Sequence, residues 1–175
     1  LTEREAHLNR ILQLDSDHGG ARRALGYSHL NGEWVRQDDW RKSKGYQLYQ
    51  GRWRLSQEIE ILERRRKQEL AEKDWLQKLR RLRATLADSV KGAEAREQMS
   101  AVVDPNAVAA IREMLKTEPF PALRSFYVEI LGQIGAPAAD LLMQVSILDL
   151  DEEVRYAALD QIAKVDPPHA GKFYI

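Results

Sequence analysis

Residues 104–134, DPNAVAAIREMLKTEPFPALRSFYVEILGQI, and residues 135–165, GAPAADLLMQVSILDLDEEVRYAALDQIAKV, repeat one pattern at a shift of 31 positions. The residues that superpose are Ile111 and Leu142, Glu118 and Asp149, Leu123 and Val154, Arg124 and Arg155, Leu131 and Ile162, and Ile134 and Val165. A repeat of this length is typical of a solenoid, because one helix pair cannot bury its apolar face without a stacked neighbour. The pattern therefore predicts two consecutive helix pairs.

Each repeat predicts two helices. The expected helices lie near Asn106–Thr117 and Pro121–Ile134 in the first repeat and near Pro137–Leu148 and Glu152–Val165 in the second. In the first repeat, Pro105 lies in the first helical turn, where its missing N–H has no cost. We expect the apolar positions of the second helices to be buried, namely Leu123, Ile130, Leu131, Ile134, Val154, Ala158, Ile162 and Val165.

Less regular units flank this repeat. Ser56 is expected to cap a long helix from Gln57 to about Ala87, Gly92 to break the helical stretch, and a second helix to follow over Ala93–Val102. Asp74–Val103 would then be a divergent leading unit of the solenoid. Residues 166–175 open a third unit, truncated within its first helix. There Phe173 falls on the repeat position of Leu142. We expect the flank that this unit leaves uncovered to cause weak self-association.

The second helices of the repeat, LRSFYVEILGQIG at 123–135 and DEEVRYAAL at 151–159, resemble the HEAT-like repeats of the short, phycobilisome-lyase type. The resemblance covers residues 104–175 and implies an α-solenoid of antiparallel helix pairs, whose second helices line the concave face. It also implies a polar ladder between neighbouring units, formed by Glu118, Arg124, Asp149 and Arg155. The exposed positions of the second helices would then give a possible partner surface, made of Ser125, Glu129, Tyr156 and Asp160.

Residues 26–56 contain a second repeat, with a period of 19 residues. Gly26-Tyr27 recurs as Gly45-Tyr46, Gly32 as Gly51, and Trp34 as Trp53. Each unit predicts a β-hairpin: Asn31-Gly32 is a strong two-residue turn signal, and Gln50-Gly51 is a weaker version of it. The predicted register places His29 opposite Trp34 and Leu48 opposite Trp53.

The hairpins allow two interpretations. Packing explains the recurring tryptophans, because one two-stranded hairpin is marginally stable in water and must lie on another hairpin or on helices. Alternatively, Trp34, Trp53 and Tyr49 could stack on a small ligand such as a peptide or a carbohydrate. The hairpin units resemble segments of large bacterial multidomain proteins that also carry helical repeats, which implies an accessory role.

The first 25 residues predict helices. A helix over Glu3–Leu14, the run Asp15-Ser16-Asp17-His18-Gly19-Gly20-Ala21 and a short helix to Leu25 resemble a junction between tetratricopeptide (TPR) units. The aspartates also have the spacing that begins a calcium loop. However, the twelfth position, which needs a glutamate, is Gly26. Helix capping by Asp15 or Asp17 is therefore the favoured interpretation.

The long helix carries the basic run Arg64–Lys67, which could contact the phosphates of a nucleic acid. Four glutamates surround this run, and ion pairs at helical spacing would neutralise it. A solvated helix face is therefore favoured over a nucleic-acid site. The charges of the whole chain balance, with 27 basic and 27 acidic residues, and give no general attraction to nucleic acid or anionic membrane.

Composition and motifs give no support for catalysis. The chain has no cysteine and only four histidines, which lack metal-ligand spacing, and no phosphate-binding or nucleophile motif occurs. We therefore expect no enzyme activity, no metal and no cofactor. No apolar run approaches the roughly 20 residues that span a bilayer. The sequence begins at Leu1, so we expect a fragment of a longer protein and leave its compartment open.

The sequence thus predicts a mainly α-helical chain. Its parts are a TPR-like start over residues 1–25, a twin-hairpin module over 26–56, a long helix with a divergent unit over 57–103, and HEAT-like repeats over 104–175. The favoured function is a non-catalytic scaffold for a protein or peptide partner, because solenoids display extended surfaces. Ligand binding on the hairpins and nucleic-acid contact through Arg64–Lys67 remain the alternatives.

Overall fold

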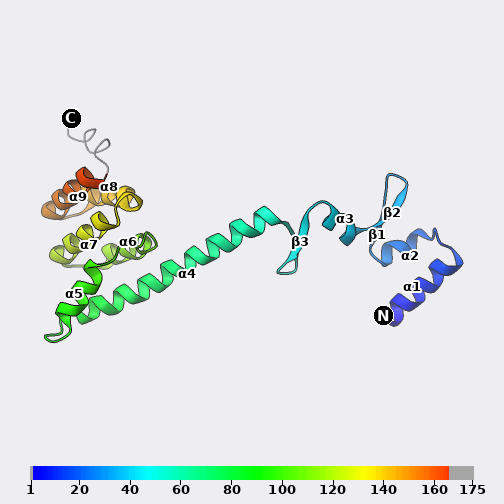
Figure 1. Ribbon diagram of the computed structural model, residues 1–175, viewed down its shortest axis with the longest axis horizontal. Helices are drawn as coiled ribbons and strands as arrows, with labels where there is room; N and C mark the ends of the chain where they lie inside the picture. The colour runs from blue at the N-terminus through cyan, green and yellow to red at the C-terminus, as the bar shows by residue number, and fades with distance from the viewer. Residues whose placement is uncertain (1, 166–175) are drawn as a thin grey trace. The chain divides into compact units, whose positions relative to one another are not determined.

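The computed structural model describes residues 2–165, which are mainly helical and divide into two compact units. Unit 1 comprises residues up to Arg64 and unit 2 begins at Arg65. The elements of unit 1 are α1 (Glu3–Leu14), α2 (Gly19–Ala24), β1 (Tyr27–Leu30), β2 (Glu33–Arg36), α3 (Gln37–Ser43), β3 (Tyr46–Tyr49), β4 (Arg52–Leu55) and the start of α4 (Ser56–Thr85) (Figure 1).

The two predicted hairpins are confirmed. β1 pairs with β2 and β3 with β4, both antiparallel, and the register places His29 opposite Trp34 and Leu48 opposite Trp53. The turns have positive φ at both central residues, 51° and 90° at Asn31 and Gly32 and 48° and 77° at Gln50 and Gly51. Such turns match the twist of the strands. They favour glycine at the second position, because other residues rarely adopt these angles.

Each hairpin lies on the short helix that precedes it. α2 packs against β1, and α3 packs against both β2 and β3. The two hairpins form separate two-stranded sheets. The 19-residue period therefore corresponds to a helix followed by a hairpin, and we name residues 17–35 module 1 and residues 36–54 module 2.

A side-chain hydrogen bond links each hairpin to the helix after it, with the two partners exchanged between the two cases. Gln37 Nε2 donates to Ser28 Oγ at 2.7 Å, and Gln47 Nε2 donates to Ser56 Oγ at 3.0 Å. In the first bond the serine lies on the strand and the glutamine begins the next helix, whereas the second bond has the opposite order. The bond ties each hairpin to the helix that follows it.

Capping in unit 1 differs from the prediction in one respect. The first turn of α2 is capped by His18, whose Nδ1 accepts a hydrogen bond from the Ala21 N–H at 3.1 Å, and not by Asp15 or Asp17. Asp15 instead ends α1 and accepts a bond from the Asp17 N–H. A histidine can cap in this way only through a neutral ring nitrogen, which the sequence pattern for caps does not include.

Unit 2 contains the end of α4 and five further α-helices in the described part of the chain. These are α5 (Gly92–Ser100), α6 (Ala107–Thr117), α7 (Pro121–Ile134), α8 (Ala139–Leu148) and α9 (Glu152–Val165), with a 3-10 turn, η1 (Ala136–Ala138), before α8. The bounds predicted for α7 and α9 are confirmed, and α6 and α8 begin one and two residues later than predicted. Gly92, which was predicted to break the helical stretch, is itself the first residue of α5.

One apolar core runs through unit 2. α7 packs against α6 and α9, and α8 packs against α9, so that the pair α6–α7 lies beside the pair α8–α9 (Figure 1). Six of the eight residues predicted to form this core are buried, whereas Leu123 and Val165 are only half-buried. Both lie at an end of their helix, where a neighbouring helix covers less of the side chain. The predicted third unit with Phe173 lies outside the described residues.

The turn between α4 and α5 requires glycine. A Cβ on Gly92 would lie 2.7 Å from the carbonyl oxygen of Leu86, a backbone atom that cannot move without disturbing the turn. Asp88 fixes the same turn, because its carboxylate accepts the N–H groups of Val90 and Lys91.

We predict that Gly92→Ala lowers the free energy of unfolding by roughly 1–3 kcal/mol, because the added methyl group overpacks a rigid turn. Urea unfolding followed by circular dichroism measures the change. The matched control is Gly132→Ala, whose Cβ would meet the side chain of Gln161 and not a backbone atom. A smaller cost for Gly92→Ala than for this control would contradict the steric argument.

Candidate functional site

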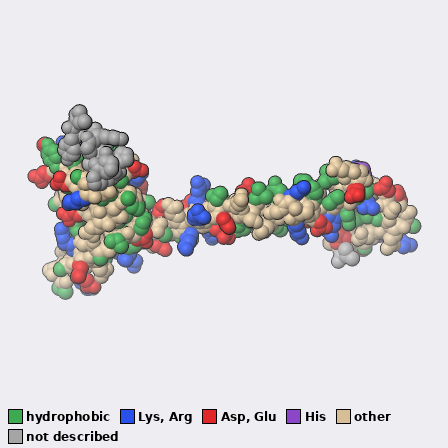
Figure 2. Space-filling view, turned by 45° about the horizontal axis from the view of Figure 1, so that its top comes forward, with side chains coloured by type: hydrophobic (Ala, Val, Ile, Leu, Met, Phe, Trp, Pro, Cys, Tyr) green, Lys and Arg blue, Asp and Glu red, His purple; other side chains and the backbone are tan. Residues whose placement is uncertain are grey.

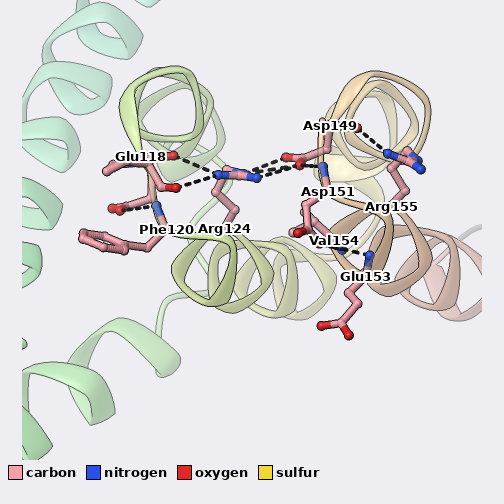
Figure 3. A network of polar contacts seen from close by, with 9 residues as sticks. Glu118, Phe120, Arg124, Asp149, Asp151, Glu153, Val154 and Arg155 are labelled. Atoms are coloured by element: carbon pink, nitrogen blue, oxygen red, sulfur yellow. Dashed lines mark hydrogen bonds and ion pairs between the residues drawn. The ribbon is translucent and has the colours of Figure 1, made fainter.

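Arg124 joins the two helix pairs of unit 2 through a carboxylate. Its Nε donates to Asp149 Oδ2 at 2.9 Å and its Nη2 to Asp149 Oδ1 at 3.0 Å, which makes a bidentate pair. Both side chains are nearly buried, with 12% and 9% of their surface exposed. The Nη1 of Arg124 donates to the carbonyl oxygens of Glu118 and Pro119, in its own helix pair (Figure 3). One guanidinium therefore holds its own loop and the next one.

Arg83, in α4, forms a second bidentate pair with a carboxylate. Its Nε donates to Glu118 Oε2 at 2.6 Å and its Nη2 to Glu118 Oε1 at 3.1 Å. The hydroxyl of Tyr127, which is fully buried, donates to Glu118 Oε2 at 3.0 Å. The same carboxylate accepts the Phe120 N–H at 3.3 Å. The Glu118 carboxylate therefore pairs with Arg83 of α4 and not with the side chain of Arg124.

The geometry gives the four predicted ladder residues distinct positions. Arg124 and Asp149 form an ion pair with each other, and Glu118 pairs with Arg83, a residue outside the predicted ladder. Arg155 occupies the repeat position of Arg124 and donates through Nη1 to the carbonyl oxygen of Asp149 at 2.8 Å (Figure 3). Arg83 lies in the long helix, outside the 31-residue repeat. Only a search for an arginine that could face Glu118 would have found it.

The surroundings of Glu118 lower the pKa of its carboxylate. Burial alone would raise the pKa of Glu118, but hydrogen bonds from Arg83, the Phe120 N–H and Tyr127 outweigh burial, so its pKa lies below the ordinary value of 4.5. Burial and the Glu118 carboxylate both raise the pKa of Tyr127. The carboxylate is therefore charged and the phenol neutral at neutral pH.

This shift predicts a pH dependence of stability. Because the pKa of Glu118 is lower in the folded chain, its contribution is fully present above pH 4.5 and is lost as the pH falls through the folded pKa. At pH 7, Glu118→Gln should be less stable than the wild type. Between pH 7 and pH 3, the variant should lose less of its free energy of unfolding than the wild type loses. Urea midpoints at each pH measure both effects. Parallel curves for the two proteins would contradict the assignment.

The four residues predicted to form a partner surface all lie on α7 and α9. Glu129, Tyr156 and Asp160 are exposed, with 59% of Tyr156 accessible, and Ser125 is half-buried. The Tyr156 hydroxyl donates to Glu152 Oε1 at 3.0 Å. Because α7 packs on α9 and the residues superpose in the repeat, the surface presents equivalent positions of two adjacent helices.

Unit 2 also has a groove of about 660 Å³ between α4 and α6. Its lining includes the apolar residues Leu76, Val108 and Pro137 and charges of both signs, such as Glu72 and Arg112. The groove is a concave surface beside α4 and α6.

The tryptophans of the hairpins contact neighbouring side chains. Trp34 is half-buried, and its Nε1 donates to Asp17 Oδ1 at 2.7 Å. The His29 ring meets it edge-on at 4.9 Å, and the Arg22 guanidinium lies 5.8 Å from its ring centre. Trp53 is also half-buried, with the Arg41 guanidinium 5.5 Å from its ring centre. Since a guanidinium lies over each ring, these contacts favour packing over ligand stacking.

Tyr49 is the third residue predicted to stack on a ligand. It is half-buried on the face of its hairpin away from Trp53, and its hydroxyl accepts a bond from Gln50 Nε2 at 3.2 Å. Tyr49 and Trp53 therefore lie on opposite faces of one hairpin and cannot bind one ring between them.

The ion pairs predicted for the basic run Arg64–Lys67 are not found. In residues 2–165 the ion pairs are Arg41–Asp38, Arg83–Glu118, Lys116–Glu113 and Arg124–Asp149. The four side chains of the run are exposed, and Figure 2 shows basic side chains on opposite sides of α4. Consecutive helical residues point in different directions, so the run forms no single stripe along a nucleic-acid backbone.

The described residues contain no group of three or more potential ligands that could hold a metal ion. None of the helices in residues 2–165 has the length and apolar character needed to cross a bilayer. No family model, curated protein or solved structure matches the chain.

Proposed function

We propose that this protein is a non-catalytic scaffold that binds a protein or peptide through the exposed faces of α7 and α9. The observation that carries the proposal is the bidentate Arg124–Asp149 pair, which fixes one helix pair against the next. Such a pair holds equivalent positions of two helices at a constant spacing. A constant spacing is what a surface needs to recognise an extended partner.

The proposal includes a HEAT-like solenoid as the architecture of this unit. The 31-residue period, the side-by-side packing of α7 and α9, and the arginine–carboxylate pairs support it. In this arrangement the second helices form the binding side, and the groove between α4 and α6 lies on the first-helix side. We infer no enzymatic role from the resemblance to HEAT-like repeats.

The exposed face of α7 and α9 favours a partner with cationic side chains around an apolar anchor. Glu129, Glu153 and Asp160 are exposed there, and the ring of Tyr156 gives an accessible aromatic surface between them. Tyrosine is a residue that often carries binding energy, and the carboxylates would steer basic segments toward it.

A paired variant tests this surface. The full chain, the double variant Glu129→Lys/Tyr156→Ala and the control Glu113→Ala/Lys116→Ala are used to capture proteins from cells that express the protein. Quantitative mass spectrometry then identifies what each retains. A protein kept by the wild type and the control, lost by the surface variant and bound directly after purification supports the proposal. Equal binding by all three chains overturns this surface.

A further inference from the structure

Module 1 shows how a hairpin of this kind binds a carboxylate. The Trp34 indole N–H donates to Asp17 Oδ1 at 2.7 Å, and the Arg22 guanidinium lies over the same ring. Arg22 Nε also donates to the Ser16 carbonyl at 2.8 Å, beside Asp17. The carboxylate thus accepts an indole N–H from a ring that a guanidinium also covers, and the donor and the cation together form a corner suited to an anionic oxygen.

Module 2 repeats this corner without the carboxylate. A shift of 19 residues places Trp53 on Trp34 and Arg41 on Arg22, and the guanidinium again lies over the ring, 5.5 Å from its centre. The same shift places Arg36 on Asp17, so that the position of the acid carries a cation. Module 2 therefore keeps the indole donor and the guanidinium of module 1, but has an arginine where module 1 has its carboxylate acceptor.

The Trp53 indole N–H has no acceptor among the described residues, whereas Trp34 donates to Asp17 and Trp75 donates to Asp104 at 2.8 Å. No fully buried side-chain nitrogen in the described part of the chain lacks a partner, so this N–H is not fully buried. Of the two aspartates of module 2, Asp38 pairs with Arg41 at 3.4 Å, and both of these side chains are substantially exposed.

The net charges of the two modules differ in the same direction as the change from Asp17 to Arg36. Module 1 carries two arginines and two acidic residues, which balance. Module 2 carries six basic residues and two aspartates, a formal charge of +4. The basic residues of module 2 are Arg36, Arg41, Lys42, Lys44, Arg52 and Arg54. An anionic group is therefore attracted to module 2 and not to module 1.

We propose that module 2 is a docking site for an acidic peptide segment, whose aspartate or glutamate carboxylate accepts the Trp53 indole N–H beside the Arg41 guanidinium, where module 1 holds its own Asp17. The exposed side chain of Leu48, 64% accessible and opposite Trp53 in the hairpin, provides an apolar contact for the peptide next to the carboxylate. The site lies in unit 1 and does not depend on the surface of α7 and α9.

Nuclear magnetic resonance of the indole N–H groups tests the proposal in the full chain. The four indole signals are assigned with single Trp→Phe variants and followed during titration with an acetylated Gly-Asp-Gly-Asp-Gly amide at constant ionic strength. The Trp53 signal should move in a saturable way. Those of Trp34 and Trp75 should stay, because each already binds a carboxylate. The Gly-Asn-Gly-Asn-Gly peptide, which has no charge, should move none of them.

Three variants follow from the repeat. Arg41→Gln should raise the dissociation constant at least tenfold, whereas Arg41→Lys should retain most of the binding. Arg36→Asp places an acid at the repeat position of Asp17, and should move the Trp53 signal without peptide and prevent further response. Asp17→Ala removes the internal carboxylate of module 1 and should make Trp34 respond to the peptide.

Several results would overturn the proposal. A Trp53 signal that does not move, or moves equally with the neutral peptide, excludes carboxylate recognition. Tighter binding of inorganic phosphate than of the peptide assigns the site to a different anion. A Trp53 signal that moves in Asp38→Asn without any peptide shows that Asp38 already occupies the indole N–H. The same titration of the Glu129→Lys/Tyr156→Ala variant should leave the Trp53 response unchanged, which separates this site from the proposed scaffold surface.

Discussion

Asp149→Ala is expected to lower the free energy of unfolding of unit 2 by about 3–5 kcal/mol, because it leaves the buried Arg124 guanidinium without its bidentate partner. Only 12% of the arginine side chain and 9% of the aspartate side chain are exposed, so water cannot replace the lost carboxylate. Asp149 Oδ1 also accepts the Asp151 N–H at 2.9 Å, at the start of the loop into α9. Urea unfolding at pH 7, followed at 222 nm, measures the loss.

The control for this variant is an exposed ion pair in the same unit. Glu113 and Lys116 are 48% and 59% exposed, so Glu113→Ala should cost about 1 kcal/mol or less. In a double-mutant cycle, Arg124→Ala and Asp149→Ala together should cost less than the sum of the two single changes, since removing the second charge relieves the first. Strict additivity, or equal costs for Asp149→Ala and Glu113→Ala, would show that the pair does not hold the two helix pairs together.

Leu131→Ala is expected to cost about 2–5 kcal/mol, the range for removing a large side chain from a packed core. Leu131 is fully buried on α7, at the repeat position of Ile162 on α9, and α7 and α9 pack directly on each other. Its loss leaves a cavity that rigid helices cannot close. Leu150→Ala is the control, because Leu150 is 96% exposed and its removal should change stability by less than about 0.5 kcal/mol. Similar costs for both leucines would contradict the packing.

The sequence predicted those parts of the fold that repeat. The 31-residue period indicated the bounds of α7 and α9, and the 19-residue period with Asn31-Gly32 indicated both hairpins and their register. These features depend on local turn chemistry and on periodic apolar residues. Both can be read from a single chain, because neighbouring units must satisfy the same packing requirement.

The sequence predicted the candidate sites less well, because their partners come from outside the repeats. Arg83 pairs with Glu118 across 35 positions of the chain, and Asp17 binds Trp34 across 17. Neither contact follows a helical or strand spacing, so no local pattern indicates it. The cap of α2 was missed for a different reason. His18 caps α2 through a ring nitrogen, whereas the usual N-cap residues accept the hydrogen bond with a side-chain oxygen.

The exchanged bonds Ser28–Gln37 and Gln47–Ser56 have a consequence for evolution and for design. Serine and glutamine can each be donor and acceptor, so two ancestral copies could diverge to opposite orders while keeping the same link between hairpin and helix. Substitution at one position alone removes the Ser–Gln pair, because it leaves two serines or two glutamines at these positions. A consensus protein built by averaging aligned positions one at a time can therefore lose the bond, whereas one that treats the two positions as an inseparable pair retains it.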